Sequence, residues 1–169
     1  EGFHPAAGQP HAEVFALRDA GELARGADLY VTLEPCCHQG RTGPCTEAIL
    51  RAGIARVFVG VQDPNPLVAG QGLQRLRDAG LAVTCDVQSG VCQELIAPFR
   101  KQVTGGMPYV VFKAAMTLDG QIAAAGGDSQ WISCAASREL VHQLRNQVDA
   151  ILVGSGTVTT DDPRLTTRL

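Results

Sequence analysis

The chain has 169 residues, of which 45% are hydrophobic and 18% are charged, and its formal net charge is −3. This size allows one or two small domains with a real core, and the acidic balance argues against nonspecific nucleic-acid binding, which usually leaves a basic excess. No apolar run approaches the roughly 20 residues that cross a bilayer, so we expect a cytoplasmic protein with neither membrane nor nucleic acid as a partner.

Short apolar segments alternate with helix-forming segments over the first hundred residues. The residue types and their spacing predict helices over 11–17, 46–52, 72–79 and 91–102. Runs rich in β-branched residues predict strands over 29–33, 56–61 and 81–86. Strands that alternate with helices over short links form βα units, so we expect a three-layer α/β sheet.

A cluster of turn-forming residues at 104–108 indicates a domain boundary. We therefore expect one domain over 1–104 and the start of a second over 108–169. In the second part, the pattern predicts strands over 109–114, 121–123 and 150–153, a helix over 137–147 with Ser137 as its N-cap, and a Gly-rich turn over 154–157. The chain begins without Met and ends just after a Pro-bearing turn, so we expect neighbouring segments to be missing at both ends.

Three of the six cysteines lie within ten residues, at 36, 37 and 45, which favours metal ligands over disulfides. Catalytic zinc takes three protein ligands and leaves one position for water, and His11, Cys36 and Cys45 offer an N,S,S set. Each lies at or just before a predicted helix start, where the helix dipole favours thiolates. Glu13, two residues after His11, can then face the open position and move protons, as in zinc deaminases.

A structural zinc site is the alternative, with Cys37 or His38 as a fourth ligand. Eight residues separate Cys36 from Cys45, whereas nucleoside deaminases keep two. This longer loop carries Arg41, which suits a substrate with a phosphate, although Arg41 as a solvated surface charge remains the plainer interpretation.

Several segments resemble the bifunctional deaminase/reductase of riboflavin biosynthesis. In the first part they are 11–14, 30–45 and 62–72, and in the second 113–120, 129–133 and 153–163. The resemblance implies a cytidine-deaminase-like domain that lacks its first helix and strand, followed by the start of a dihydrofolate-reductase-like α/β reductase domain. It also implies assembly into a homo-oligomer. Gly43 stands where this family usually has Pro.

The family removes ammonia from 2,5-diamino-6-ribosylamino-4(3H)-pyrimidinone 5′-phosphate and then reduces the ribosyl side chain to ribityl with NADPH. By resemblance, one zinc ion per chain would be held by His11, Cys36 and Cys45, and Glu13 would be the proton shuttle. Because the family's reductase continues well past residue 169, we expect this chain as given to bind NADPH weakly.

The resemblance assigns substrate and cofactor contacts to further positions. The deaminase substrate would contact His4, His38 and Arg41; NADP would contact Ala115, Trp131, Thr157 and Asp161; and the reductase substrate would contact Ser129, Arg145, Leu165 and Arg168. Three other interpretations stay open: a deaminase of an unphosphorylated base or nucleoside, a non-catalytic zinc-stapled domain, and an RNA-editing deaminase, which the acidic balance and low aromatic content disfavour.

The substitution Arg41→Ala separates the two deaminase interpretations. If Arg41 binds the phosphate, its loss removes charge-assisted hydrogen bonds and lowers the rate on the phosphorylated pyrimidine by roughly 10–100-fold. The same variant should act on the dephosphorylated substrate nearly as fast as the unchanged protein. Ammonia release measures both rates, and equal losses on the two substrates would contradict a phosphate contact.

Overall fold

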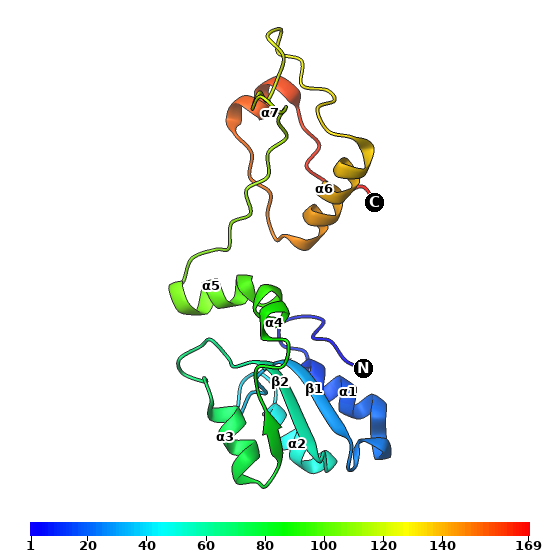
Figure 1. The fold of residues 1–169 in the computed structure, drawn as a ribbon, viewed down its shortest axis with the longest axis vertical. Coiled ribbons are helices and arrows are strands. Elements are labelled where there is room, and N and C mark those ends of the chain that lie inside the picture. Colours follow the sequence, from blue (N-terminus) through cyan, green and yellow to red (C-terminus); the bar gives the residue numbers. More distant parts are fainter. The chain divides into compact units, whose positions relative to one another are not determined.

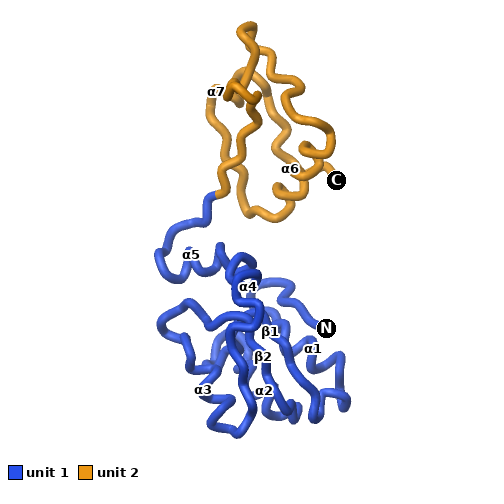
Figure 2. The backbone as a smooth tube through the Cα atoms, in the orientation of Figure 1, with its two compact units in different colours: residues 1–110 blue, residues 111–169 orange.

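A computed structural model describes all residues from 1 to 169, which form two compact units, residues 1–110 and residues 111–169 (Figure 2). The first unit is built on a parallel sheet of three strands in the order β1 (Asp28–Leu33), β2 (Arg56–Val61) and β3 (Ala82–Thr84) (Figure 1). In its register Leu29 lies opposite Val57, and Val57 lies opposite Val83.

One face of this sheet forms the core with the helices that precede β1 and those that connect the strands. These helices are α1 (Ala12–Ala20), η1 (Gly21–Ala24), α2 (Cys45–Ala52) and α3 (Gln71–Asp78). Val57 and Val59 of β2 are fully buried, as are Ile49 of α2 and Leu76 of α3. Since burial of one such side chain contributes about 1.5–3 kcal/mol, this layer supplies much of the unit's stability.

The opposite face of the sheet is covered in part by α4 (Ser89–Leu95), which is followed by α5 (Ala97–Gly105). Side chains alternate between the two faces along a strand, so the residues that adjoin Val57 and Val59 in β2 point to this second face. Gly60 lies against Cys92 of α4, and the rings of Tyr30 and Phe58 stack with centroids 4.7 Å apart. Helices therefore lie on both faces of the sheet, which confirms the predicted three-layer α/β architecture.

The structure corrects the single helix expected over 91–102. Two helices lie there, α4 and α5, and Ile96 separates them. Pro98 lies in the first turn of α5, where a missing N–H is tolerated, but inside a continuous helix its ring would clash with the carbonyl four residues earlier. The strand expected over 81–86 is also shorter, ending at Thr84.

The second unit contains two helices, α6 (Ala135–Gln147) and α7 (Ser155–Asp161), and no strand. The strands expected over 109–114, 121–123 and 150–153 are therefore wrong for this structure. A strand needs a neighbour to satisfy its N–H and C=O groups, and residues 111–169 form no hydrogen-bonded ladder. Phe112 and Leu152 are about 90% exposed or more, so the apolar pattern typical of buried strands is not buried here.

The start of α6 also differs from the expectation. Cys134, not Ser137, is the N-cap, and its Sγ lies 3.3 Å from the Ser137 hydroxyl inside the first turn. Ala135 and Ala136 are strong helix formers, which extends the helix toward the N-terminus. The segment expected to form a Gly-rich turn over 154–157 is instead the start of a helix. Gly154 is the N-cap of α7, and Ser155 is its first residue.

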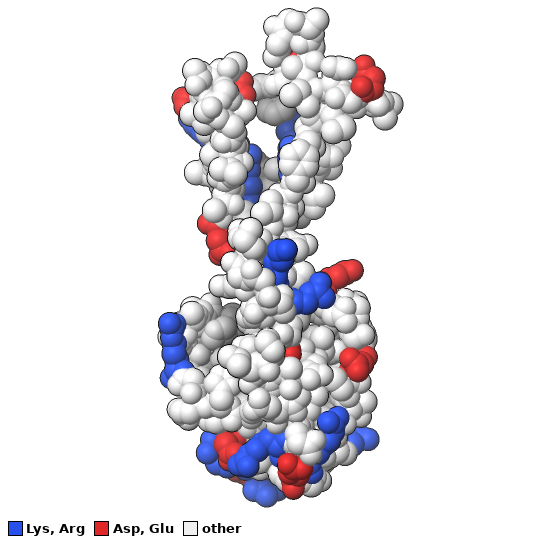
Figure 3. Space-filling model, turned by 90° about the vertical axis from the view of Figure 1, so that its left-hand side faces the viewer, with Lys and Arg blue, Asp and Glu red and all other residues white.

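The charged groups of the first unit are mixed in sign. On the face drawn in Figure 3, Lys and Arg side chains lie among Asp and Glu side chains at the lower end of residues 1–110. Two exposed ion pairs lie in the first unit, Arg56 with Asp28 and Arg75 with Glu47. No helix of the structure combines the length and the apolar character needed to cross a membrane.

The close contact at Gly60 predicts a stability effect. A Cβ atom there would lie 2.2 Å from the Cys92 Sγ and 2.7 Å from the Thr32 carbonyl oxygen, so Gly60→Ala forces α4 away from the sheet. We expect it to lower the free energy of unfolding by about 1–3 kcal/mol in urea denaturation followed by circular dichroism. Gly90→Ala is the matched control, since Gly90 faces open space in α4 and alanine favours helix. Equal stability of the two variants would contradict the packing described.

Candidate metal centre

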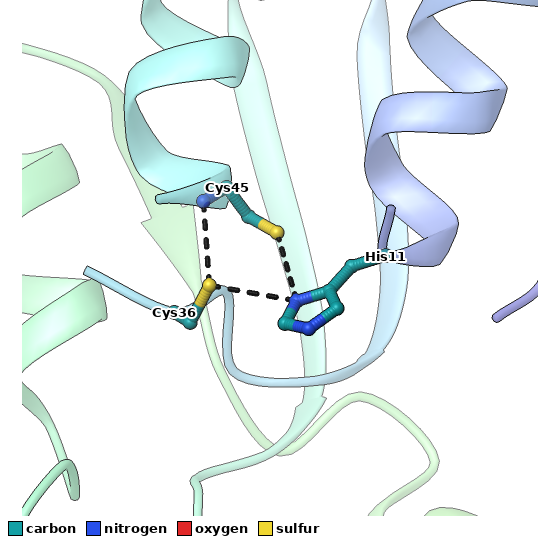
Figure 4. A group of neighbouring side chains, drawn as sticks. All are labelled: His11, Cys36 and Cys45. Carbon is teal, nitrogen blue, oxygen red and sulfur yellow. Dashed lines mark hydrogen bonds between the residues drawn. The ribbon is translucent and has the colours of Figure 1, made fainter. Parts of the chain in front are cut away.

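The imidazole of His11 is placed by the start of α1. His11 is the N-cap of this helix, with φ −73° and ψ 164°, and its carbonyl accepts the first helical hydrogen bond, from the Val14 N–H. Its Nδ1 lies 3.2 Å from the Cys45 Sγ and 3.5 Å from the Cys36 Sγ (Figure 4). The helix start therefore directs one nitrogen toward both sulfurs.

The two sulfurs come from the end of β1 and the start of α2. Cys36 follows the buried Pro35, three residues after Leu33, the last residue of β1, and its carbonyl accepts a hydrogen bond from the Thr46 N–H. Cys45 is the first residue of α2 and is fully buried. Its backbone N–H points at the Cys36 Sγ at 3.3 Å, so the free N–H groups of a helix start face one of the sulfurs.

The three donor atoms form one group in which all lie within 4.8 Å of one another. In a tetrahedral zinc site, Zn–N distances of about 2.0–2.1 Å and Zn–S distances of about 2.3 Å place nitrogen and sulfur ligands about 3.5 Å apart. The separations of 3.2 and 3.5 Å between the His11 Nδ1 and the two sulfurs fit this geometry. Neither Cys37 nor His38 adds a donor atom to the group, which leaves a fourth position open.

The electrostatics of the group favour a bound cation. A hydrogen bond from the Cys45 thiol is the main cause that lowers the pKa of Cys36 to about 5, and the Cys45 N–H and the His11 imidazole act in the same direction. The pKa of Cys45 is raised, chiefly because its thiol donates to Cys36 and because it is buried. One thiolate is thus already present at neutral pH, and a metal would displace the proton of the second thiol.

Glu13 lies beside the donor group in the first turn of α1. Burial is the main cause that raises the pKa of its carboxyl group, while a backbone hydrogen bond and a hydrogen bond with Cys45 lower it. Glu13 contributes no atom to the metal-ligand group itself. A carboxyl group of this kind, next to an open coordination position, can take up and return a proton.

A cavity of about 280 Å³ opens beside His11. It is lined by His4, Ala7, Gly8, Gln9, His11, His38, Gly40, Arg41 and Thr42. The rings of His4 and His11 meet edge to face at 5.2 Å, and the His4 Nδ1 donates a hydrogen bond to the Pro10 carbonyl. All three residues expected to contact the deaminase substrate therefore lie in one cavity with one of the candidate metal ligands.

The residues expected to form the reductase sites are only partly brought together in the second unit. Ser129 and Trp131 line one cavity, and the Trp131 ring stacks under the Arg138 guanidinium at 4.3 Å. Arg145 and Arg168 both donate to the Arg164 carbonyl. The remaining positions lie elsewhere in the unit: Thr157 and Asp161 on α7, Ala115 in the segment before the turn at 117–120, and Leu165 after α7.

Sequence reasoning missed Glu34, a buried carboxylate two residues before Cys36. It is 4% exposed and accepts hydrogen bonds from backbone N–H groups of the segment 63–73. The available signal was an acidic residue placed between a buried strand and a proline. This pattern is equally typical of a solvated acidic residue at the end of a strand, so the sequence alone does not distinguish Glu34 from a surface carboxylate.

Two family models match the chain. The cytidine and deoxycytidylate deaminase zinc-binding region matches residues 1–61, and the RibD C-terminal domain matches residues 108–169. The chain is 55% identical over 166 residues to the riboflavin biosynthesis protein RibD of Synechocystis, and 52% identical over 168 residues to that of Escherichia coli. These alignments cover 98% and 99% of the chain but 45% and 46% of the relatives.

The chain is also similar to solved structures of such proteins over nearly its whole length. RibD of Acinetobacter baumannii superposes with a TM-score of 0.89 at 50% identity, covering 99% of this chain and 47% of that one. A diaminohydroxyphosphoribosylaminopyrimidine deaminase/5-amino-6-(5-phosphoribosylamino)uracil reductase of Thermotoga maritima superposes with a TM-score of 0.91 at 47% identity, covering 99% and 48%. The chain thus spans slightly less than half the length of the relatives it matches.

The donor geometry predicts which cysteines hold zinc. Cys36→Ser or Cys45→Ser replaces a thiolate by a weakly binding hydroxyl and should remove nearly all zinc from the purified chain. Cys37→Ser, one residue from Cys36, should keep about one zinc ion per chain, because three protein ligands suffice for an open site. Mass spectrometry of the purified variants measures how much zinc each of them binds. Loss of zinc in the Cys37 variant would show a closed structural site instead.

Proposed function

We propose that the chain carries out the zinc-dependent deamination of 2,5-diamino-6-ribosylamino-4(3H)-pyrimidinone 5′-phosphate, because nearly all of it is 52–55% identical to the RibD relatives of Synechocystis and Escherichia coli and its residues 1–61 match the deaminase zinc-binding region. The observation that carries this proposal is the group of His11, Cys36 and Cys45 with an open fourth position and Glu13 beside it. A non-catalytic zinc staple would need neither the open position nor a buried carboxyl group next to it.

The proposed reaction exchanges an amino group of the pyrimidine for oxygen from water. Zinc, when held by His11, Cys36 and Cys45, supplies the Lewis acid that makes water a nucleophile near neutral pH. Glu13 takes one proton from the attacking water and passes it to the ring nitrogen. It then takes the second proton, from the hydroxyl group that the water has added to the ring carbon, and delivers it to the departing amine, which leaves as ammonia while the carbonyl forms. Burial of Glu13 favours this role, because a raised pKa brings a carboxyl group closer to the pH at which it must both accept and donate.

The cavity beside His11 is the proposed place of the substrate. Arg41 gives it a fixed positive charge and a forked set of donors that match a phosphate. The His4 Nδ1 donates to the Pro10 carbonyl, so in the neutral ring the His4 Nε2 is free to accept a hydrogen bond from an amino group of the pyrimidine. His38, on the same loop as Arg41, also lines the cavity.

We further propose that the second unit contributes the start of an NADPH-dependent reductase that reduces the ribosyl side chain to ribityl in the complete protein. The match of residues 108–169 to the RibD C-terminal domain supports this. On that basis NADP would contact Ala115, Trp131, Thr157 and Asp161, and the reductase substrate would contact Ser129, Arg145, Leu165 and Arg168. We also propose that copies of the protein assemble into a homo-oligomer.

A cytoplasmic location is part of the proposal. All six cysteines are free, which suits a reducing compartment, and two of them would serve as metal ligands. The competing function is deamination of a base or nucleoside without phosphate. The position of Arg41 in the cavity, rather than on a remote surface, favours the phosphorylated substrate.

The substitution Glu13→Gln tests the catalytic role. Glutamine keeps the size of the side chain but cannot carry the proton, so we expect ammonia release from the diaminopyrimidine ribotide to fall by about 10²–10⁴-fold while zinc content stays unchanged. Glu22→Gln, the same chemical change at an exposed residue of η1, should keep full activity. A zinc-loaded Glu13 variant that releases ammonia as fast as the unchanged protein would refute the proposed mechanism.

A further inference from the structure

The carboxylate of Glu34 is buried and fully engaged by backbone N–H groups. Its Oε2 accepts from Asp63 at 3.0 Å and from Gly70 at 2.9 Å. Its Oε1 accepts from Gly72 at 2.8 Å and from Leu73 at 3.2 Å. A buried charge is costly unless such bonds satisfy it, so this arrangement fixes the carboxylate and its four donors to one another.

The four donors belong to one segment that runs from the end of β2 into α3. Gly72 and Leu73 lie in the first turn of α3, whose N–H groups have no partner within the helix. The N-cap residue Gly70 offers no side chain, so Glu34 supplies the cap from a different strand. The carboxylate therefore joins the β2–α3 connection to the end of β1.

The same contact reaches the backbone that carries Cys36. Pro35, between Glu34 and Cys36, is fully buried, and its carbonyl oxygen lies so close to Gly72 that a Cβ there would approach it to 2.0 Å. On its other side, the Cys36 carbonyl accepts from the Thr46 N–H of α2. Cys36 is thus held between α2 and the Glu34 contact with α3.

We propose that Glu34 is a positioning residue that fixes the Cys36 sulfur for metal binding. The inference rests on the proposed zinc site. A glutamine at this position keeps the length of the side chain, but its Nε2 is a donor and would face two backbone N–H groups that have no other acceptor. The β2–α3 connection then separates from the end of β1, and Cys36 loses its support on that side.

The test compares Glu34→Gln with the unchanged full chain by two measurements. Zinc affinity is measured by competition with a chromophoric chelator, and amide hydrogen exchange is measured on both the metal-free and the zinc-loaded protein. We expect exchange at residues 63, 70, 72 and 73 to accelerate at least about tenfold in both forms, since two of these N–H groups lose their acceptor and the segment that carries all four separates from the end of β1. We expect the zinc Kd to rise roughly 10–100-fold, as is typical when the support of a metal ligand is removed.

Two control variants separate positioning from general destabilisation. Glu47→Gln makes the same chemical change at the exposed ion pair between α2 and α3, and Val83→Ala loosens the core at β3, which pairs with the start of β2. Both should leave the zinc Kd within about twofold of the unchanged protein at temperatures where they stay folded. If Glu34→Gln does not fold, Glu34→Asp, which keeps the charge but withdraws it by one methylene, takes its place with the same expected direction.

A zinc Kd for the Glu34 variant equal to that of the unchanged chain would overturn the proposal, as would a Val83→Ala variant that loses zinc to the same extent. Failure of the unchanged chain to bind zinc would instead refute the proposed function. In that case the exchange of metal-free protein at residues 63, 70, 72 and 73 would still report whether the Glu34 contact exists.

Discussion

Two sulfurs and an imidazole nitrogen must lie within a few ångströms of one another before any metal is bound. Three elements of the fold each supply one of these donor atoms, so their relative positions are constrained. The parallel pairing of β1 with β2 sets where Cys36 emerges, the start of α2 brings Cys45 to it, and the start of α1 adds His11. The N–H of Cys45 pointing at the Cys36 sulfur links two of these elements directly. A shift of any one element would separate the donors, so the chemistry of the site depends on the packing of the sheet.

The connection between β2 and α3 extends this dependence beyond the ligands. Through Glu34 it reaches the end of β1. Burial raises the pKa of Asp63 in this segment, and the imidazole of His38, on the loop that lines the cavity, acts in the opposite direction. The backbone that supports Cys36 and the loop that lines the cavity are therefore coupled by one segment.

The sequence predicted most of what local rules govern. The βα alternation predicted the strands and helices of the first unit, and the N,S,S set of His11, Cys36 and Cys45 anticipated a group that the structure does bring together. Only His11 and Cys45 lie at helix starts, however, while Cys36 follows the end of β1. Glu34 escaped notice because its partners are backbone N–H groups about 30 to 40 residues away, which no local pattern reveals. The break between α4 and α5 at Ile96 does have a local signal, because Pro98 fits the first turn of a helix but not its interior. In the second unit, the apolar runs around Phe112 and Leu152 indicated strands, yet a strand exists only with a partner, and pairing depends on the rest of the sheet rather than on the run itself.

X-ray absorption at the zinc edge of the purified full chain tests the central claim most directly, because it reports the ligands of the metal without relying on activity. An open catalytic site predicts two sulfurs at about 2.3 Å, one imidazole nitrogen at about 2.0–2.1 Å and one further oxygen from water. A third sulfur or a second imidazole in place of that oxygen would mean that Cys37 or His38 closes the site, and it would contradict the catalytic account.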